Sequence, residues 1–374
     1  MTNPPPPPPR RSPRPKRRPS PTDALRARVL PSADDVRAAA ERLAGRINQT
    51  PLRRSESLSA FLGGDVFLKL ECQQLTGSFK IRGATNALLG LSPEIRKRGV
   101  VTASAGNHGL GIAAAALKLD IEATIFLPAS APALKRERIT ALGATIDSSA
   151  VSYDDAERLA REQAARSGAT FISPCTGKSL LAGQGTVAME ILDELPLVRT
   201  IVASVGGGGL IGGIAAFIKT EAPYVRIIGA QSEHTNAMAL ALAAGVPTDI
   251  PDQPTLADGL AGRVDAEMLA QGQASMDSIA VVSESQLAQA IAFLWIDEGI
   301  KVEGAGAAAV AAALSGELHG GSTNRPMQHR RATPPAFSTT APAQRAPVEF
   351  PIVIVVSGGN IDDDKLHAIV NSRP

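Results

Sequence analysis

The chain has 374 residues, of which 44% are hydrophobic and only 3% aromatic, and its formal net charge is +2. This length is too great for one small core and suits two packed domains or one large α/β unit. No apolar run reaches the roughly 18 residues of a membrane-spanning helix, so we expect no membrane partner. Cys72 and Cys175 lie far apart in sequence and make no CxxC pair or disulfide framework, so we expect a reducing, cytoplasmic location.

Two Pro- and Arg-rich segments, residues 1–22 and 320–348, differ from the rest of the chain. They hold ten of the 38 Lys and Arg residues and none of the 36 Asp and Glu residues, so the remainder is acidic. Proline lacks the amide donor and restricts φ, so we predict a disordered tail and a disordered insertion. The tail either binds a proline-recognising domain or a polyanion, or is a dispensable extension. We favour the extension and expect no nucleic-acid partner.

Between these segments, helical and strand patterns alternate. The predicted order is helix 33–47, strand 65–71, helix 79–91, strand-turn-helix 98–119, strand 122–128, helix 132–144, strand-turn-helix 199–220, strand 225–230 and strand 349–360. The last strand is a continuous apolar run, which is typical of a strand buried on both faces. Repeated strand-turn-helix units predict the α/β class, with parallel sheets covered by helices on both sides.

Ligands of parallel sheets bind beyond the carboxyl ends of the strands, so turns that directly follow strands are candidate sites. Gly206–Gly209 precede a helix and allow several backbone amides to point at one anion, such as a phosphate. A tight turn without a ligand is the alternative, but each glycine costs backbone entropy that a turn alone does not require. Gly207, Gly209 and Gly212 also match a dinucleotide fingerprint, with Glu233 after the next strand, so an NAD-binding enzyme is a second interpretation.

Two further turns follow predicted strands. Ser104–Gly109 ("SAGNHG") combines small residues with a helix start near His108, where backbone amides can hold a carboxylate and Asn107 can bond a ring oxygen. An Asn/Gly turn with ordinary capping is the alternative. Ser357–Asn360 ("SGGN") ends the last strand, so Ser357 either presents its hydroxyl to a ligand or caps a helix.

Lys80 lies in "LTGSFKIRGATN" between Phe79 and Ile81. Ser78 is a plausible N-cap, which would place Phe79 and Lys80 in the first helical turn. There the helix dipole prefers anions, and burial among apolar neighbours disfavours a charged amine. Both effects favour the neutral amine, which is the nucleophile that forms a Schiff base with a carbonyl cofactor.

Six motifs occur in one order: "GSFKIRGA", "SAGNHG", "AGQGT", "VGGGGL", "LADG" and "SGGN". From about Val36 to Asn371, the chain resembles the pyridoxal-phosphate enzymes of fold type II, which include tryptophan synthase β. Within them it is similar to threonine and serine dehydratases, a group that includes serine racemase and hydroxyectoine-utilisation dehydratases. The resemblance implies two open, twisted, mainly parallel sheets with helices on both faces. The cofactor would lie in a cleft between a large domain (23–96 and 175–374) and a small domain (97–174).

The resemblance also implies a role for each motif residue. Lys80 would carry pyridoxal 5'-phosphate as a Schiff base. The other implied contacts are Phe79 and Gly259 on the faces of the ring, Asn107 at the ring hydroxyl, Ser357 at the pyridine nitrogen, Gly206, Gly207, Gly208, Gly209 and Leu210 around the phosphate, and Ser104, Ala105, Gly106, Asn107 and His108 around the substrate carboxylate. In relatives, Glu303 lies near the cofactor; a helix-start carboxylate is the alternative.

The implied reaction is elimination of water from a hydroxy amino acid such as L-threonine or L-serine, which yields a 2-oxo acid and ammonia. A homodimer is also implied. Three alternatives stay open: a specialised dehydratase of the hydroxyectoine-utilisation type or a 3-hydroxyaspartate ammonia-lyase, an NAD-binding oxidoreductase, and an inactive scaffold that acts through its Pro/Arg tail.

Three positions depart from the pattern of relatives. Those with a divalent cation site have a Glu where this chain has Gln231, and Ala237 stands where a further acid is expected. We therefore expect no metal. Serine racemase has a second Ser in its "SAGNHG"-like turn, which serves the opposite face of the substrate from the lysine. Here that position is Ala105, so we expect little racemase activity.

Overall fold

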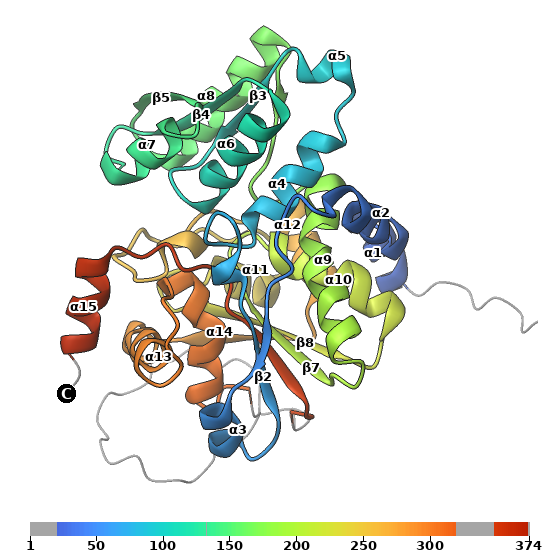
Figure 1. Ribbon diagram of the computed structural model, residues 1–374, viewed down its shortest axis with the longest axis vertical. Helices are drawn as coiled ribbons and strands as arrows, with labels where there is room; N and C mark the ends of the chain where they lie inside the picture. The colour runs from blue at the N-terminus through green and yellow to red at the C-terminus, as the bar shows by residue number, and fades with distance from the viewer. Residues whose placement is uncertain (1–20, 132, 319–347, 373–374) are drawn as a thin grey trace, which may run out of the picture.

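The computed structural model describes residues 21–131, 133–318 and 348–372. Within these ranges ten strands form one six-stranded and one four-stranded sheet, each surrounded by helices (Figure 1). Most of the predicted tail and insertion therefore lies outside the described residues. Two of the predicted boundaries are wrong, because helix α1 begins at Pro21 and Val348 is buried.

The larger sheet has the strand order β1-β2-β10-β7-β8-β9. Its strands are β1 (Leu52–Arg54), β2 (Val66–Lys69), β10 (Ile352–Val355), β7 (Thr200–Ser204), β8 (Arg226–Ser232) and β9 (Ser278–Val282). β1 pairs antiparallel with β2, and every other pairing in this sheet is parallel. The prediction of a mainly parallel sheet is confirmed.

Strand β10 shows why its sequence is a continuous apolar run. Ile352 and Ile354 pack on one face, with helices α13 (Glu284–Ile296) and α14 (Gly304–Leu314). Val353 and Val355 pack on the other face, with α9 (Lys178–Glu194) and α10 (Gly209–Glu221). None of the four strand side chains is exposed to solvent, because successive side chains of a strand point to opposite faces and both faces are covered.

The smaller sheet has the order β5-β4-β3-β6, and its pairings are all parallel. Its strands are β3 (Val100–Ala103), β4 (Ala123–Pro128), β5 (Thr145–Ala150) and β6 (Thr170–Phe171). Helix α8 (Tyr153–Ser167) covers one face, where Val101 packs in a cluster with Ala156 and Ala160. Helix α6 (Asn107–Leu119) covers the other, where Val100 packs in a cluster with Ile112.

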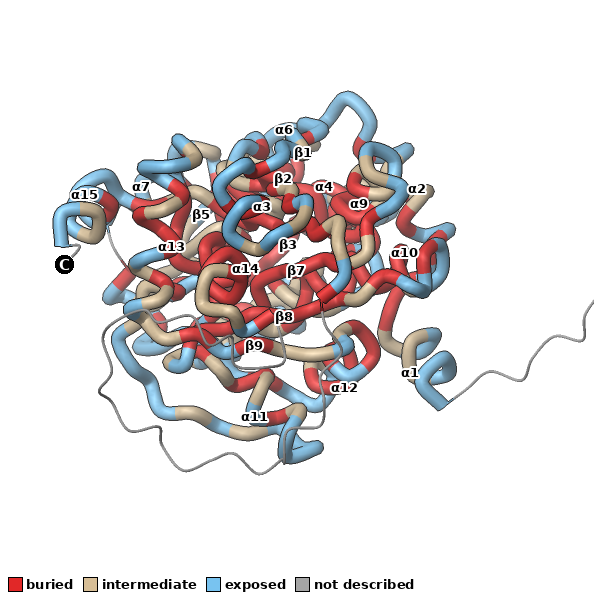
Figure 2. Tube along the Cα trace, turned by 90° about the horizontal axis from the view of Figure 1, so that it is seen from below, coloured by how far each residue is buried: buried red, intermediate tan, exposed pale blue. Residues whose placement is uncertain are grey.

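The remaining helices connect and surround the sheets. They are α1 (Pro21–Val29), α2 (Ala33–Leu43), α3 (Glu56–Leu62), α4 (Lys80–Leu89), α5 (Pro93–Arg96), α7 (Ala133–Thr140), α11 (Ala237–Ala244), α12 (Ala266–Ser275) and α15 (Asp363–Asn371), with 3-10 turns η1 (Glu71–Gln73) and η2 (Asp258–Leu260). Figure 1 shows α4 between the two sheet units. Buried residues concentrate around β7, β8, α9, α10 and α14, whereas α1 and α15 lie at the periphery (Figure 2). No helix in the described ranges is long and apolar enough to cross a membrane.

Two predicted helices end at least three residues earlier than the sequence pattern suggested. The helix predicted over 33–47 ends at Leu43, because Gly45 adopts a left-handed φ of 70° just after it. The helix predicted over 132–144 ends at Thr140, and Gly143 has a φ of 79°. In both cases the apolar spacing continued past the point at which the backbone leaves the helix.

Candidate active site

A cavity of about 480 Å³ lies between the two sheet units, at the carboxyl ends of β3, β7 and β10. This volume falls within the range of small-molecule sites. Every residue to which the family resemblance assigns a cofactor or substrate contact lines this cavity: Phe79, Lys80, Ser104, Ala105, Gly106, Asn107, His108, Gly206, Gly207, Gly208, Gly209, Leu210, Gly259 and Ser357. The fold thus brings together residues from distant parts of the chain.

Lys80 is the first residue of α4, and its side chain is half-buried in the cavity wall. Its Nζ donates to the carbonyl oxygen of Pro174 at 2.8 Å and lies 5.2 Å from the centre of the Phe79 ring. The expected N-cap is wrong: Phe79 occupies that position without a side-chain cap, and the buried hydroxyl of Ser78 has no partner among the residues that the structure describes. Instead, the turn is held by its backbone, since the Phe79 amide donates to the carbonyl of Ser357 at 3.2 Å.

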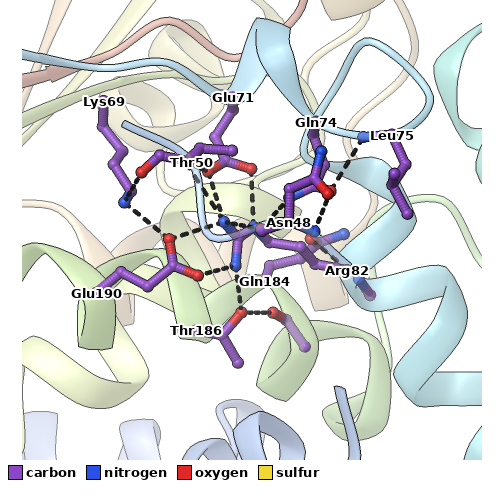
Figure 3. Close-up of polar contacts among 12 residues, drawn as sticks. Asn48, Thr50, Lys69, Glu71, Gln74, Leu75, Arg82, Gln184, Thr186 and Glu190 are labelled. Atoms are coloured by element: carbon purple, nitrogen blue, oxygen red, sulfur yellow. Dashed lines mark hydrogen bonds and ion pairs between the residues drawn. The ribbon is translucent and has the colours of Figure 1, made fainter. Parts of the chain in front are cut away.

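Arg82, two residues after Lys80, belongs to a buried polar network that no pattern in the sequence predicted (Figure 3). The side chain of Arg82 is fully buried and donates to Glu190 on α9, at 2.6 Å from Nη1 to Oε1. Glu190 also forms an ion pair with the buried Lys69 of β2, at 2.7 Å. Gln74 accepts the backbone amide of Leu75 at 3.0 Å, so the segment before the Lys80 turn is held as well.

The Gly206–Gly209 loop joins β7 to α10. Gly208 has a φ of 88°, and a Cβ on Gly207 would come within 2.7 Å of the sulfur of Cys175. Because α10 begins at Gly209, the amides of its first turn have no intrahelical acceptor and face the cavity end of the helix. The loop therefore has a geometry that could bind an anion, with the positive end of the helix dipole behind it.

Ser204, at the end of β7, was missed by sequence reasoning. It lines the cavity, is only 5% exposed, and its hydroxyl has no hydrogen-bond partner among the described residues. A buried hydroxyl without a partner costs about 1–3 kcal/mol, so a bound ligand or water would satisfy it. Its position one residue before Val205 and the glycine loop was the available sequence clue.

Residues 104–108 form the turn from β3 into α6. The Ser104 hydroxyl accepts the Gly106 amide at 3.2 Å, and Gly106 is the N-cap of α6. The first-turn amides of α6 are therefore available to an anion in the cavity. His108 is buried with Nε2 3.3 Å from the carbonyl of Ile172, and burial, followed by the charge of Lys80, lowers its pKa to about 3. His108 is thus neutral at physiological pH.

Asn107 and Glu303 meet at the cavity wall. The Asn107 amide donates to Oε1 of Glu303 at 2.5 Å. Burial raises the pKa of Glu303 to about 7, and the hydrogen bond from Asn107 opposes this shift. Glu303 is the N-cap residue of α14, so it is a helix-start carboxylate as the alternative expected, although it makes no side-chain cap bond; it also lines the cavity.

Ser357 is 4% exposed, and its hydroxyl lies 3.4 Å from the carbonyl oxygen of Ala305. The next helix, α15, begins at Asp363 and has Asp362 as its N-cap. Ser357 is therefore not a helix cap, and it lines the cavity instead.

The structure also bears on the metal site and on the dinucleotide fingerprint that the sequence analysis considered. Gln231 connects β8 to the start of α11, because Nε2 donates to the carbonyl of Thr235 and Oε1 accepts the amide of Ala239, both at 2.9 Å. Among residues 21–131, 133–318 and 348–372, no group of three His, Cys, Asp or Glu residues could hold a metal ion. Glu233, which a dinucleotide ribose would need, is absent from the cavity lining, and Glu233 accepts the amide of Glu284 instead.

Comparison with known proteins decides between the remaining cofactors. A family profile described as "Pyridoxal-phosphate dependent enzyme" matches residues 43–324, which is most of the chain. The chain belongs to this family. Over 339 residues, this pyridoxal-phosphate enzyme is 37% identical to L-threonine ammonia-lyase of Thermotoga maritima, covering 90% of this chain and 78% of the relative. It is 34% identical to a catabolic L-threonine dehydratase of Staphylococcus aureus, covering 93% of this chain and 94% of the relative.

Solved structures agree with this assignment. Maize serine racemase superposes with a TM-score of 0.79 at 33% identity, covering 90% of this chain and 96% of the racemase. The processed threonine deaminase isoform 2 of Solanum lycopersicum superposes with a TM-score of 0.76 at 31% identity, covering 90% of this chain and 91% of the deaminase. The fold class expected from the sequence, with two mainly parallel sheets and helices on both faces, is confirmed.

The residues present fit pyridoxal phosphate. The glycine loop and the α10 N-terminus suit its phosphate, and the Lys80 amine suits its aldehyde. A Cβ on Gly259 would come within 2.9 Å of Cβ of Ala305, so this position of the cavity wall has little room for a side chain. The unpartnered hydroxyl of Ser204 is a further place for a polar group of the cofactor or its solvent.

Proposed function

We propose that this pyridoxal-phosphate enzyme is an ammonia-lyase that dehydrates L-threonine or L-serine to a 2-oxo acid and ammonia. Relatives named as threonine ammonia-lyase and threonine dehydratase, at 34–37% identity over most of the chain, support this reaction. The observation that carries the proposal is the position of Lys80 Nζ, in one cavity with an anion-binding glycine loop and with the open N-terminus of α6.

When bound, pyridoxal phosphate supplies an electron sink that acidifies the α-hydrogen of the amino acid. Lys80 Nζ lines the cavity and would accept this proton, once it is released from the carbonyl of Pro174. The first-turn amides of α6 would hold the substrate carboxylate, and Gly206–Gly209 would hold the phosphate.

Ser357 would face the pyridine nitrogen and Asn107 the ring hydroxyl. A hydroxyl such as that of Ser357 holds a protonated pyridine less well than a carboxylate does. The ring is then a weaker electron sink, which suits elimination with early departure of the leaving group better than transamination. Phe79 and Gly259 would lie on the two faces of the ring.

We further propose that residues 97–174 form a small domain and that residues 23–96 and 175–374 form the large one. The small domain would close over the substrate and exclude water, as the cavity lined from both sheet units supports. The homodimer and the cytoplasmic location expected from the sequence remain part of this proposal.

Lys80→Ala tests the proposal directly. It should abolish ammonia release and the borohydride-reducible attachment of the cofactor, while circular dichroism stays unchanged. Lys97→Ala, which changes an exposed lysine outside the cavity, is the control and should behave as the wild type. A Lys80→Ala variant that still retains cofactor after reduction would overturn the assignment.

The substrate itself is tested by a panel assayed for ammonia. L-threonine and L-serine should give the highest kcat/KM. A preference for 3-hydroxyaspartate or for a hydroxyectoine-derived amino acid would instead support the specialised dehydratase considered above.

A further inference from the structure

Four side chains form a continuous chain of hydrogen bonds from the surface to the cavity wall. Nη2 of Arg138 donates to Oδ1 of Asn360 at 2.8 Å, and Nδ2 of Asn360 donates to Oδ1 of Asn107 at 2.7 Å. Asn107 in turn donates from Nδ2 to Glu303 at 2.5 Å. Three of these residues come from different parts of the fold: Arg138 from α7, Asn107 from the start of α6, and Asn360 from the turn after β10.

This series of hydrogen bonds has one direction. Each donor points away from the guanidinium of Arg138 and toward the carboxylate of Glu303. The cationic end at Arg138 can only donate, and the carboxylate end at Glu303 accepts. Reversing the amide of Asn107 would set its oxygen against Glu303 and its nitrogen against that of Asn360. The orientation of Asn107 is therefore determined by its two neighbours, and its second N–H remains for a group bound in the cavity.

Asn360 uses the full hydrogen-bonding capacity of its amide nitrogen. Besides Asn107, its Nδ2 donates to the carbonyl of Thr76 at 2.8 Å. Its amide lies against Gly77, where a Cβ would come within 2.6 Å of Oδ1 and where φ is 73°. The Gly359 amide also donates to the carbonyl of Gly77 at 2.9 Å. Asn360 thus connects the turn before Lys80 to the start of α6.

Among the described residues, Arg138 is positioned by a hydrogen bond rather than by an ion pair. Within the described ranges, no carboxylate lies at ion-pair distance from its guanidinium, whereas the arginines of α8, such as Arg158, have acidic partners. Its hydrogen bond to Asn360 crosses from the four-stranded unit to the turn that follows β10. The bond therefore forms only when α7 is seated against that turn.

We propose that Asn360 is a positioning residue that sets the orientation of the Asn107 amide, and that Arg138 makes this orientation depend on the seating of α7. Asn107 then presents its free N–H to the cofactor ring only when the two units are docked. The inference rests on the proposed function for its kinetic readout, but not for its spectroscopic one.

The test compares holoenzyme variants by visible absorbance without substrate, by kcat and KM, and by thermal midpoint. Asn360→Asp keeps the oxygen that accepts from Arg138 but replaces Nδ2 with a second oxygen. This oxygen would face the carbonyl oxygen of Thr76 and Oδ1 of Asn107. It should shift the absorbance maximum of the bound cofactor and lower kcat about 10- to 100-fold, more than it changes KM. Arg138→Ala should lower kcat roughly 2- to 10-fold, and Arg138→Lys, which keeps a donor, should restore part of it.

Arg136→Ala is the matched control, since Arg136 lies on the same helix but does not line the cavity. It should match the wild type in every readout. A purely structural role would lower the thermal midpoint of Asn360→Asp and leave the spectrum and kcat of the folded protein unchanged, and that result would overturn the proposal. If Asn360→Asp fails to fold, the Arg138→Ala and Arg138→Lys variants test the proposal instead. The proposal would be refuted if both variants had the same absorbance spectrum and the same kcat as the wild type.

Failure of the proposed function gives a different pattern. The wild type would then release no ammonia from threonine or serine, while the absorbance shift of Asn360→Asp would still support the positioning role.

Discussion

Arg82 and Glu71 form a two-point ion pair in which neither side chain is exposed to solvent. Nε and Nη2 of Arg82 donate to the two carboxylate oxygens of Glu71, each at 2.8 Å. Such a paired geometry matches the planar guanidinium to the carboxylate, and Thr50 gives Glu71 a further hydrogen bond at 2.5 Å. The pair joins η1 to the first turn of α4, close to Lys80.

Arg82→Ala should lower the free energy of unfolding by about 3–5 kcal/mol, because it leaves Glu71 buried without its partner. Urea unfolding of the variant and the wild type measures the effect. Arg158→Ala, which removes exposed ion pairs on α8, is the control and should change stability by no more than about 1 kcal/mol. Equal losses for the two variants would contradict the role given to the buried network.

Ser204→Ala should act in opposite directions on the cofactor-free and the cofactor-bound protein. Removing a buried hydroxyl without a partner should stabilise the free protein by up to about 1 kcal/mol. The same change should weaken binding of pyridoxal phosphate roughly 2- to 10-fold, because the hydroxyl lines the cavity beside the glycine loop. Thermal unfolding and a fluorescence titration with pyridoxal phosphate measure the two effects.

Thr235→Val is the matched control for this experiment. Its hydroxyl is also buried without a partner among the described residues, but Thr235 does not line the cavity. It should stabilise the free protein without changing cofactor affinity. Unchanged affinity in Ser204→Ala would show that only water meets this hydroxyl.

Glu303→Gln should remove a pH dependence of stability. Burial raises the pKa of Glu303 to about 7, above its ordinary value of 4.5, so the folded state holds the proton more tightly than the unfolded state. The wild type should therefore lose stability relative to the variant as the pH rises from about 4.5 to about 7. The difference should then stay constant, at no more than about 3 kcal/mol.

Urea unfolding of both cofactor-free proteins at about pH 5, 6, 7 and 8 measures this difference. Glutamine keeps an oxygen that can accept from Asn107, so the comparison isolates the charge. A difference that does not vary over these pH values would contradict the burial of an ionisable Glu303.

Ala105 should keep the enzyme from racemising L-serine. Racemisation needs an acid-base group on each face of the α-carbon, and Lys80 would supply only one. Ala105 lines the cavity, and its methyl group cannot carry a proton. Loss of one positioned acid-base group costs about 10²–10⁴ in rate, so D-serine should form far more slowly than pyruvate.

Chiral chromatography after incubation with L-serine tests this expectation, and Ala105→Ser should increase D-serine formation. Production of D-serine by the wild type at a rate comparable to pyruvate would refute the role of Ala105.

The sequence was a good guide wherever the reason for a residue is local. Gly206–Gly209 must curl the backbone, and Gly208 does so with a left-handed φ. The apolar run of β10 must be buried on both faces, and it is. The Ser78 cap failed because a local capping pattern competed with a backbone contact to Ser357, which lies after a strand far along the chain.

The sequence by itself determined the alternating strand-and-helix order, the residues that follow each strand, and an unusual lysine at a helix start. These follow from periodicity and backbone chemistry within a few residues. Only the tertiary structure decided which distant groups meet: Arg138 with Asn360, Arg82 with Glu190, and the close crossing of α4 and α9. There a Cβ on Gly183 would come within 2.7 Å of the Cα of Gly83. Such contacts depend on how whole elements pack, and the sequence around one partner does not indicate the other.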